Sequence, residues 1–223
     1  MTSDSEPAQW PDSFYLIRAL SGENEGVAAA IALQTLKTYF AFARVQCDRV
    51  QDALVAAQRR LPSEAKSLPG WPDIHLYFIV WDTVFGMINA VCAHTQFPRA
   101  GRIRRQHLKT LEHYRDGRDD FEHFHERLPG SRGKKSRPLL VEHSPQEIHD
   151  VVVSGDMTGS LEVWQSGRVR GTSFTFAGKE WDVGPNSVIH LEHIVSEFVA
   201  AVLAEAQDIA GQSRPAVSHN AID

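Results

Sequence analysis

The chain contains few of the residues that mark the common metal-binding and enzyme classes. Its two cysteines, Cys47 and Cys92, form no C-x-x-C pair, which excludes a zinc knuckle. Each falls on the apolar side of an expected helix, so we expect buried, reduced thiols. No G-x-G-x-x-G, Walker, G-x-S-x-G or H-E-x-x-H motif is present, which excludes the common nucleotide-binding, hydrolase and zincin classes.

Membrane and secretion signals are also missing from the sequence. No apolar run approaches the roughly 18–20 residues that a membrane span needs. The acidic start lacks the basic and apolar regions of a signal peptide. The 42% hydrophobic and 23% charged content is typical of a soluble globular protein. We therefore expect a cytoplasmic protein without a membrane partner.

Apolar residues recur at alternating spacings of three and four in three long segments, which is typical of helices that pack lengthwise. These expected helices cover about residues 23–61, 73–97 and 103–128, and Gly117 is a candidate kink in the third. A last helix follows Gly184-Pro185. The predicted caps are Asp73 for the second helix, and Asn186 or Ser187 for the last.

Between about residues 137 and 183 the pattern changes to short alternating runs separated by turn residues. Phe174 and Phe176, for example, alternate with Ser173 and Thr175. Turns of two to four residues cannot make parallel crossovers, so this segment predicts a small antiparallel β-meander.

The expected fold is α+β and mainly α: an antiparallel helical bundle with the β-meander inserted before the last long helix. The bundle covers residues 13–130, the basic loop and meander 131–184, and the returning C-terminal helix 185–210. The ends, 1–12 and 211–223, are expected to be disordered.

A basic window interrupts this acidic chain. Residues 99–137 carry twelve Lys or Arg against six Asp or Glu, whereas the whole chain has a formal charge of −5. Within that window Arg118 is followed by Asp119 and, five positions on, by His123. This Arg-Asp-x-x-x-His segment resembles the RxxxxH motif of the HEPN family. The resemblance implies an all-α bundle, metal-independent ribonuclease activity of toxin or defence type, a homodimer and a cognate antitoxin.

The chemistry of these residue types fits RNA cleavage through the 2′-hydroxyl group. His123 can carry a proton near neutral pH, and Arg118 offers a permanent planar charge to phosphate oxygens. Asp119 and Glu122 can orient either group. No metal or other cofactor is required.

Helix geometry keeps a rival for His123 open. Residues five apart on a continuous helix point about 140° apart, whereas His125, seven positions after Arg118, falls within about 20° of it. Either Arg118 lies at a helix start or a kink near Gly117, or His125 is the closer partner. A third alternative is a composite site built by two protomers across a two-fold axis.

Basic residues on both sides of the motif are candidate contacts for RNA phosphates. The competing interpretation is a solvated helical face in which Arg118 and its acidic neighbours form i,i+4 ion pairs. A metal site is not expected, because the two histidines of His123-Phe124-His125 diverge on a helix, and His190, His193 and Glu197 lack a second Glu-x-x-His helix. The candidate nucleic-acid contacts are Arg102, Arg104, Arg105, Lys109, Arg115, Arg132, Lys134 and Lys135.

Two functions therefore remain in view. The first is an HEPN-like, metal-independent endoribonuclease of toxin or defence type. The second is a non-catalytic HEPN-like module that binds nucleic acid, a nucleotide or a partner protein.

Overall fold

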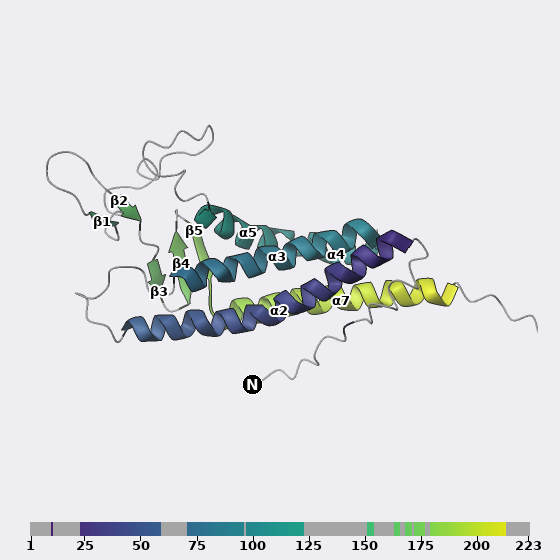
Figure 1. Ribbon diagram of the computed structural model, residues 1–223, viewed down its shortest axis with the longest axis horizontal. Coiled ribbons are helices and arrows are strands. Elements are labelled where there is room, and N and C mark those ends of the chain that lie inside the picture. Colours follow the sequence, from purple (N-terminus) through teal and green to yellow (C-terminus); the bar gives the residue numbers. More distant parts are fainter. Residues whose placement is uncertain are drawn as a thin grey trace, which may run out of the picture. The chain divides into compact units, whose positions relative to one another are not determined.

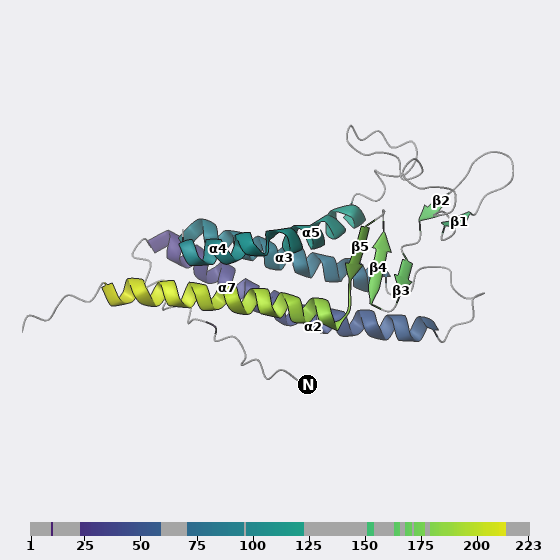
Figure 2. The same cartoon turned by 180° about the vertical axis from the view of Figure 1, so that it is seen from behind.

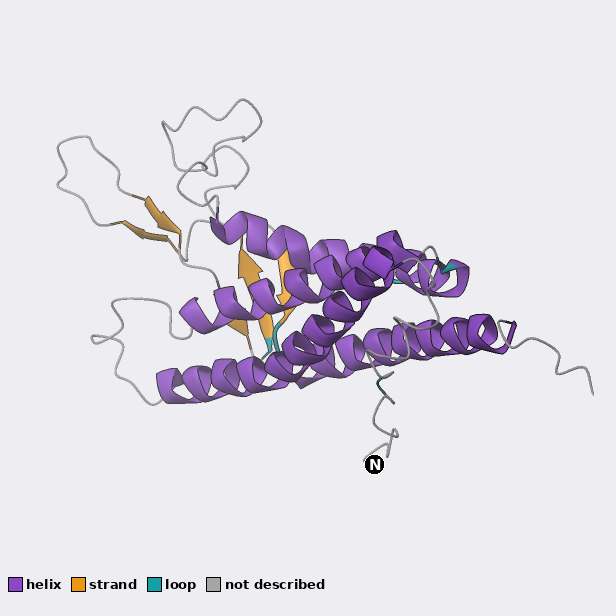
Figure 3. Cartoon of the chain, turned by 45° about the vertical axis from the view of Figure 1, so that its right-hand side comes forward, coloured by secondary structure: helices purple, strands orange, loops and turns teal. Residues whose placement is uncertain are grey.

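The computed structural model describes residue 10 and residues 23–58, 71–95, 97–122, 151–153, 163–165, 168–170, 172–176 and 179–212. Most of this part of the chain is helical, with two small antiparallel sheets (Figure 3). The mainly α fold with antiparallel strands before the last long helix is thereby confirmed. The long helices and short strands are labelled in Figure 1. The chain divides into two compact units, and the long helices contribute residues to both.

The first unit comprises residues 1–40, 83–109 and 191–223. It contains the first half of α2 (Glu23–Gln58), the second half of α3 (Trp71–Thr95), α4 (Pro98–Gln106) and most of α7 (Pro185–Gln212). Residues at three-four spacing form its apolar core, as the sequence predicted. Buried members include Leu36 of α2, Val84, Ile88 and Val91 of α3, and Leu191, Val195, Phe198 and Val202 of α7.

A carboxylate from α7 caps the start of α4. Pro98 occupies the first turn, where its missing N–H is no loss. The backbone N–H groups of Arg99 and Ala100 donate to Glu205 Oε1 and Oε2 at 2.7 and 3.2 Å. Because Glu205 is only 6% exposed, these bonds satisfy a buried carboxylate as well as the helix end.

The single helix predicted over residues 103–128 is two helices in the structure, with different bounds. The helical stretch begins earlier, at Pro98, and His107 is the turn that separates α4 from α5 (Leu108–Glu122). Gly117 does not split the helix, because α5 continues through it, and a kink there stays a prediction. Residues 123–128 lie outside the described part of the chain.

The second unit comprises residues 41–82 and 110–190 and holds all the described strands. Strands β3 (Arg168–Arg170), β4 (Ser173–Phe176) and β5 (Lys179–Asp182) form a three-stranded antiparallel sheet in chain order. Strands β1 (Val151–Val153) and β2 (Val163–Gln165) pair separately as a two-stranded sheet. The meander is therefore confirmed for β3–β5, and the segment forms two sheets instead of one.

An aromatic core joins α3, α5 and the three-stranded sheet in this unit. Phe174 and Trp181 face each other in the β4–β5 register, and both are buried while their neighbours Thr175 and Glu180 are exposed. Phe78 of α3 contacts both rings, at centroid distances of 6.0 and 5.3 Å. The core is completed by Tyr77, Trp81, Tyr114 and Phe121.

Gly117 lets α5 approach α3 at this core. A Cβ atom at position 117 would lie 2.7 Å from two ring carbons of Phe78. The glycine that the sequence suggested as a helix break is therefore a close-packing position.

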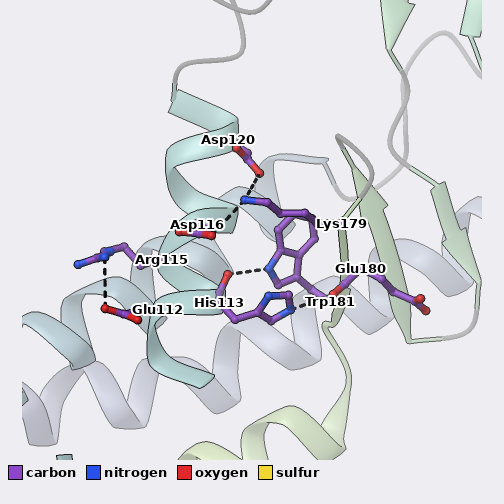
Figure 4. A network of polar contacts seen from close by, with 8 residues as sticks. All are labelled: Glu112, His113, Arg115, Asp116, Asp120, Lys179, Glu180 and Trp181. Atoms are coloured by element: carbon purple, nitrogen blue, oxygen red, sulfur yellow. Dashed lines mark hydrogen bonds and ion pairs between the residues drawn. The ribbon is translucent and has the colours of Figure 1, made fainter. Parts of the chain in front are cut away.

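Strand β5 lies beside α5 in both views (Figures 1 and 2) and is fixed to it by a series of polar contacts (Figure 4). Trp181 Nε1 donates to the backbone carbonyl of His113 at 2.8 Å, and Tyr114 Oη donates to that of Asp182 at 2.7 Å. Lys179 Nζ lies 3.1 Å from Asp116 Oδ2 and 3.4 Å from Oδ2 of Asp120, which is 1% exposed.

Lys179→Met is expected to lower the free energy of unfolding by about 1–2 kcal/mol, since it leaves the buried Asp120 carboxylate without this cation. Urea unfolding measures the change, with Lys37→Met on exposed α2 as the control. Adding Asp120→Asn to Lys179→Met should recover part of the loss. Equal stability of Lys179→Met and the wild type would contradict the assignment.

Two predicted helix caps are wrong. Helix α3 starts at Trp71, so Asp73 lies in its first turn, where it accepts a hydrogen bond from Gln46 Nε2 and pairs with Arg49. Helix α7 starts at Pro185, which places Asn186 and Ser187 inside it. Ser187 Oγ donates back to the Gly184 carbonyl at 2.7 Å.

Three helical segments are long and apolar enough, by length and composition, to cross a membrane: Glu25–Ala53, Pro72–Thr95 and Pro185–Gly211. Scattered charges such as Asp82 interrupt the apolar residues of these helices, so none forms a long continuous run, but the mean hydropathy stays high enough for a membrane span. Composition therefore does not exclude a membrane, and the expectation of no membrane partner stays a prediction.

Candidate functional site

The second unit brings three of the predicted site residues together on α5. Arg118, Asp119 and Glu122 lie in the last turn and a half of this helix, and Arg118 is about one-third exposed. Its guanidinium donates from Nη1 to Asp119 Oδ1 at 2.9 Å, and Nη2 lies 2.7 Å from Glu122 Oε2. The two carboxylates orient the arginine, as the sequence suggested.

A third carboxylate comes from α3 and was missed by sequence reasoning. Asp82 Oδ2 lies 3.8 Å from Arg118 Nε. His75 lies seven residues before Asp82, on the same face of α3, and its ring stacks on Phe121 at a centroid distance of 5.1 Å. The polarity of His75 and Asp82 could have revealed both residues in the sequence, because they are polar side chains in a helix that is otherwise mainly apolar.

Charge in this cluster differs from the positive field expected around the motif. Partial burial would lower the pKa of Arg118, but the hydrogen bond to Asp119 and the charges of Glu122 and Asp82 raise it above its ordinary value. Burial raises the pKa of Asp82, and Arg118 opposes that shift. Arg118 is thus permanently charged and faces three carboxylates, so the immediate surroundings are acidic.

His75 adds a titratable group to the cluster. Its Nε2 is buried and has no hydrogen-bond partner among the described residues. Burial lowers the pKa of His75, with Arg118 adding to the shift and Glu122 opposing it. The imidazole is therefore neutral at pH 7.

This shift predicts a loss of stability in mild acid. The unfolded chain binds a proton at His75 near pH 6.5, whereas the folded chain binds it only at lower pH. The free energy of unfolding should therefore fall as the pH drops below about 6.5. His75→Gln should flatten this slope in urea titrations between pH 7.5 and 5, while His94→Gln, which removes an exposed imidazole from α3, is the control. An unchanged slope in His75→Gln would refute the prediction.

The remaining motif residues, His123 and His125, lie outside the described residues, as do Arg132, Lys134 and Lys135. The structure nevertheless narrows the geometric alternatives. Since α5 runs from Leu108 to Glu122, Arg118 does not lie at a helix start. A kink near Gly117, His125 and a composite site between protomers remain as alternatives.

The described basic residues fall into two groups. Arg104 Nε donates to Asn89 Oδ1, and Arg115 Nη2 lies 3.8 Å from Glu112 Oε1. The other group consists of three exposed side chains at three-four spacing, Arg102 and Arg105 of α4 and Lys109 at the start of α5, which together we call the α4 basic face. No ion pair links this face to another described residue.

Among the described residues no group of three His, Cys, Asp or Glu side chains could hold a metal ion. In the first unit His107 Nε2 lies 2.8 Å from Glu197 Oε2, and His193 Nε2 lies 3.6 Å from Oε1 of the same carboxylate. Glu197 thus pairs with both His107 and His193. Cys47 is buried, and burial raises the pKa of its thiol to about 11, which suits an inert thiol.

The comparisons with known proteins add no family to this geometry: no protein-family model, curated protein or solved structure matches the chain.

Proposed function

We propose that the chain is an HEPN-like, metal-independent endoribonuclease of toxin or defence type. The observation that carries the proposal is the orientation of Arg118 by Asp119 and Glu122 on the helix that leads directly into His123. The apolar stripes of α2, α3 and α7 are those that an antiparallel helical bundle requires. The homodimer, a cognate antitoxin and a cytoplasmic location belong to the same proposal.

The proposed reaction divides the work between the two motif residues. The 2′-oxygen of RNA attacks the adjacent phosphorus and loses its proton, the bond to the 5′-oxygen breaks, and that oxygen gains a proton. His123 moves the proton, and Arg118 stabilises the charge on the non-bridging oxygens of the phosphorane. The products are a 2′,3′-cyclic phosphate and a free 5′-hydroxyl group.

Incubation of the purified protein with a mixed RNA pool in excess EDTA tests this function. Fragments with 2′,3′-cyclic phosphate ends support a metal-independent ribonuclease. RNA that stays intact through a prolonged incubation at several protein concentrations favours the second function below.

That second function is a non-catalytic module that binds nucleic acid, and a specific observation favours it. Each of the three guanidinium nitrogens of Arg118 lies within 4 Å of a carboxylate oxygen: Nε at 3.8 Å, Nη1 at 2.9 Å and Nη2 at 2.7 Å. Such an arrangement also serves as an ordinary ion-pair network. Salt-sensitive RNA binding without turnover distinguishes this function from the first.

Both functions use the α4 basic face for phosphates. Changing Arg102, Arg105 and Lys109 together to Glu should weaken RNA binding. The plot of log affinity against log salt should also become less steep by about 2, since each phosphate contact contributes about 0.7 to the steepness on single strands. Fluorescence anisotropy over a salt series measures this slope. The single variants Arg105→Glu and Lys37→Glu, the latter on exposed α2, form a matched pair. Equal effects of that pair would show that net charge, not this face, sets the affinity.

A further inference from the structure

We propose that Glu122 and Asp82 compete with the RNA phosphate for Arg118, so that the paired guanidinium is the unliganded state of the site and phosphate binding displaces Glu122. The inference rests on the proposed function in taking the incoming anion to be an RNA phosphate. It assigns a role to Asp82, which lies outside the motif.

The contacts of Arg118 are those of an occupied anion site. A guanidinium presents two edges that match the paired oxygens of a carboxylate or a phosphate. Here Nη2 is taken by Glu122 at 2.7 Å and Nη1 by Asp119 at 2.9 Å, while Nε faces Asp82 at 3.8 Å. Two of the five guanidinium N–H donors are used by carboxylates and a third carboxylate lies nearby, so a phosphate that approaches Arg118 must compete with them.

Glu122 can leave Arg118 at little cost in stability. It is about one-third exposed and pairs with Arg118 across one helical turn, and exposed pairs of this kind add little to stability. Asp119, by contrast, lies next to Arg118 in the sequence and can keep orienting the guanidinium from the side.

Asp82, on α3, opposes phosphate binding through its negative charge beside Arg118. Burial raises the pKa of Asp82 but Arg118 opposes the shift, so its charge is held by the arginine. With Arg118 countered by three carboxylates, an arriving phosphate meets net negative charge. Removing one carboxylate charge should therefore strengthen anion binding, even though it removes a contact that orients Arg118.

Equilibrium binding to a 2′-O-methyl RNA tests the inference. This RNA lacks the attacking hydroxyl group, so binding is measured without cleavage. Glu122→Gln should lower Kd by about threefold to tenfold, because one like charge near the phosphate is removed. Asp82→Asn should act in the same direction. Glu25→Gln makes the same chemical change at an exposed position of α2 and should change Kd by less than about twofold.

The gain must depend on Arg118. In an Arg118→Ala background, Glu122→Gln should give no more tightening than Glu25→Gln. A Kd for Glu122→Gln equal to or weaker than the wild-type value would overturn the inference, as would a gain that survives Arg118→Ala. These outcomes are independent of turnover: absent cleavage rejects the ribonuclease and leaves the competition for Arg118 intact.

Discussion

Arg118→Ala and His123→Ala are each expected to lower the rate of RNA cleavage at least a hundredfold. Loss of the guanidinium removes the charge that stabilises the phosphorane, an effect worth about a hundredfold to a thousandfold for comparable groups. Loss of the imidazole removes the proton carrier, whose contribution is about a hundredfold to ten-thousandfold. Initial rates on a fluorogenic RNA, in EDTA, measure both.

The double variant should be little slower than either single variant, because the two residues act in one step. His125→Ala decides between the rival histidines: a fall as large as that of Arg118→Ala, with His123→Ala unaffected, would reassign the proton carrier. Unfolding midpoints close to the wild-type value are required of all variants. If both Arg118→Ala and His123→Ala cleave at the wild-type rate, the site assignment is wrong.

A mixing experiment tests the composite site. If Arg118 of one protomer works with His123 of its partner, co-expressed Arg118→Ala and His123→Ala chains should form mixed dimers with one intact site. Activity restored well above that of either variant alone supports this arrangement. No restoration in dimers of confirmed mixed composition places both residues in one protomer.

Gly117→Ala is expected to lower the free energy of unfolding by at least about 2 kcal/mol, or roughly 4–8 °C in Tm for a domain of this size. The added methyl group would sit 2.7 Å from ring carbons of Phe78, which is fully buried. That ring cannot move freely, since it packs against Tyr114, Phe121, Phe174 and Trp181. The overlap outweighs the roughly 1 kcal/mol that alanine gains over glycine inside a helix.

Gly86 provides the matched control within α3. A Cβ atom at Gly86 meets nothing within 4 Å, so Gly86→Ala should raise stability by up to about 1 kcal/mol through helix propensity alone. Thermal unfolding of both variants should therefore give shifts of opposite sign. Introducing Phe78→Leu should reduce the cost of Gly117→Ala, and equal costs in both backgrounds would show that Phe78 is not the obstacle.

The buried faces of the long helices were predictable from the sequence, whereas their ends were not. Cys47 and Val50 in α2 and Trp81 and Ile88 in α3 are buried where the three-four spacing placed them, because burial of an apolar stripe dominates helix packing. The break at His107 carries no proline or glycine signal. It depends instead on tertiary partners, since Glu197 and Glu205 of α7 hold His107 and the start of α4.

The candidate site also has a part that was predictable from the sequence and a part that was not. Pairing of Arg118 with Asp119 and Glu122 follows from their spacing on one helix, so it could be predicted. Asp82 could not, because its distance to Arg118 is set by how α3 and α5 pack around Phe78 and Gly117. The acidic surroundings of Arg118 were missed in part for this reason: a count of charge over residues 99–137 includes Asp119 and Glu122 but omits Asp82, which arrives from another helix.

The cap that Glu205 places on α4 can form only late in the synthesis of the chain. The bonds from Arg99 and Ala100 span 106 and 105 positions of the chain. A ribosome has therefore made nearly all of α7 before the first turn of α4 can find its acceptor. Until then those two N–H groups depend on water, and α4, with only nine residues, is too short to persist alone. The arginine-rich helix α4 thus completes its N-terminal cap only after Glu205 of α7 has been synthesised.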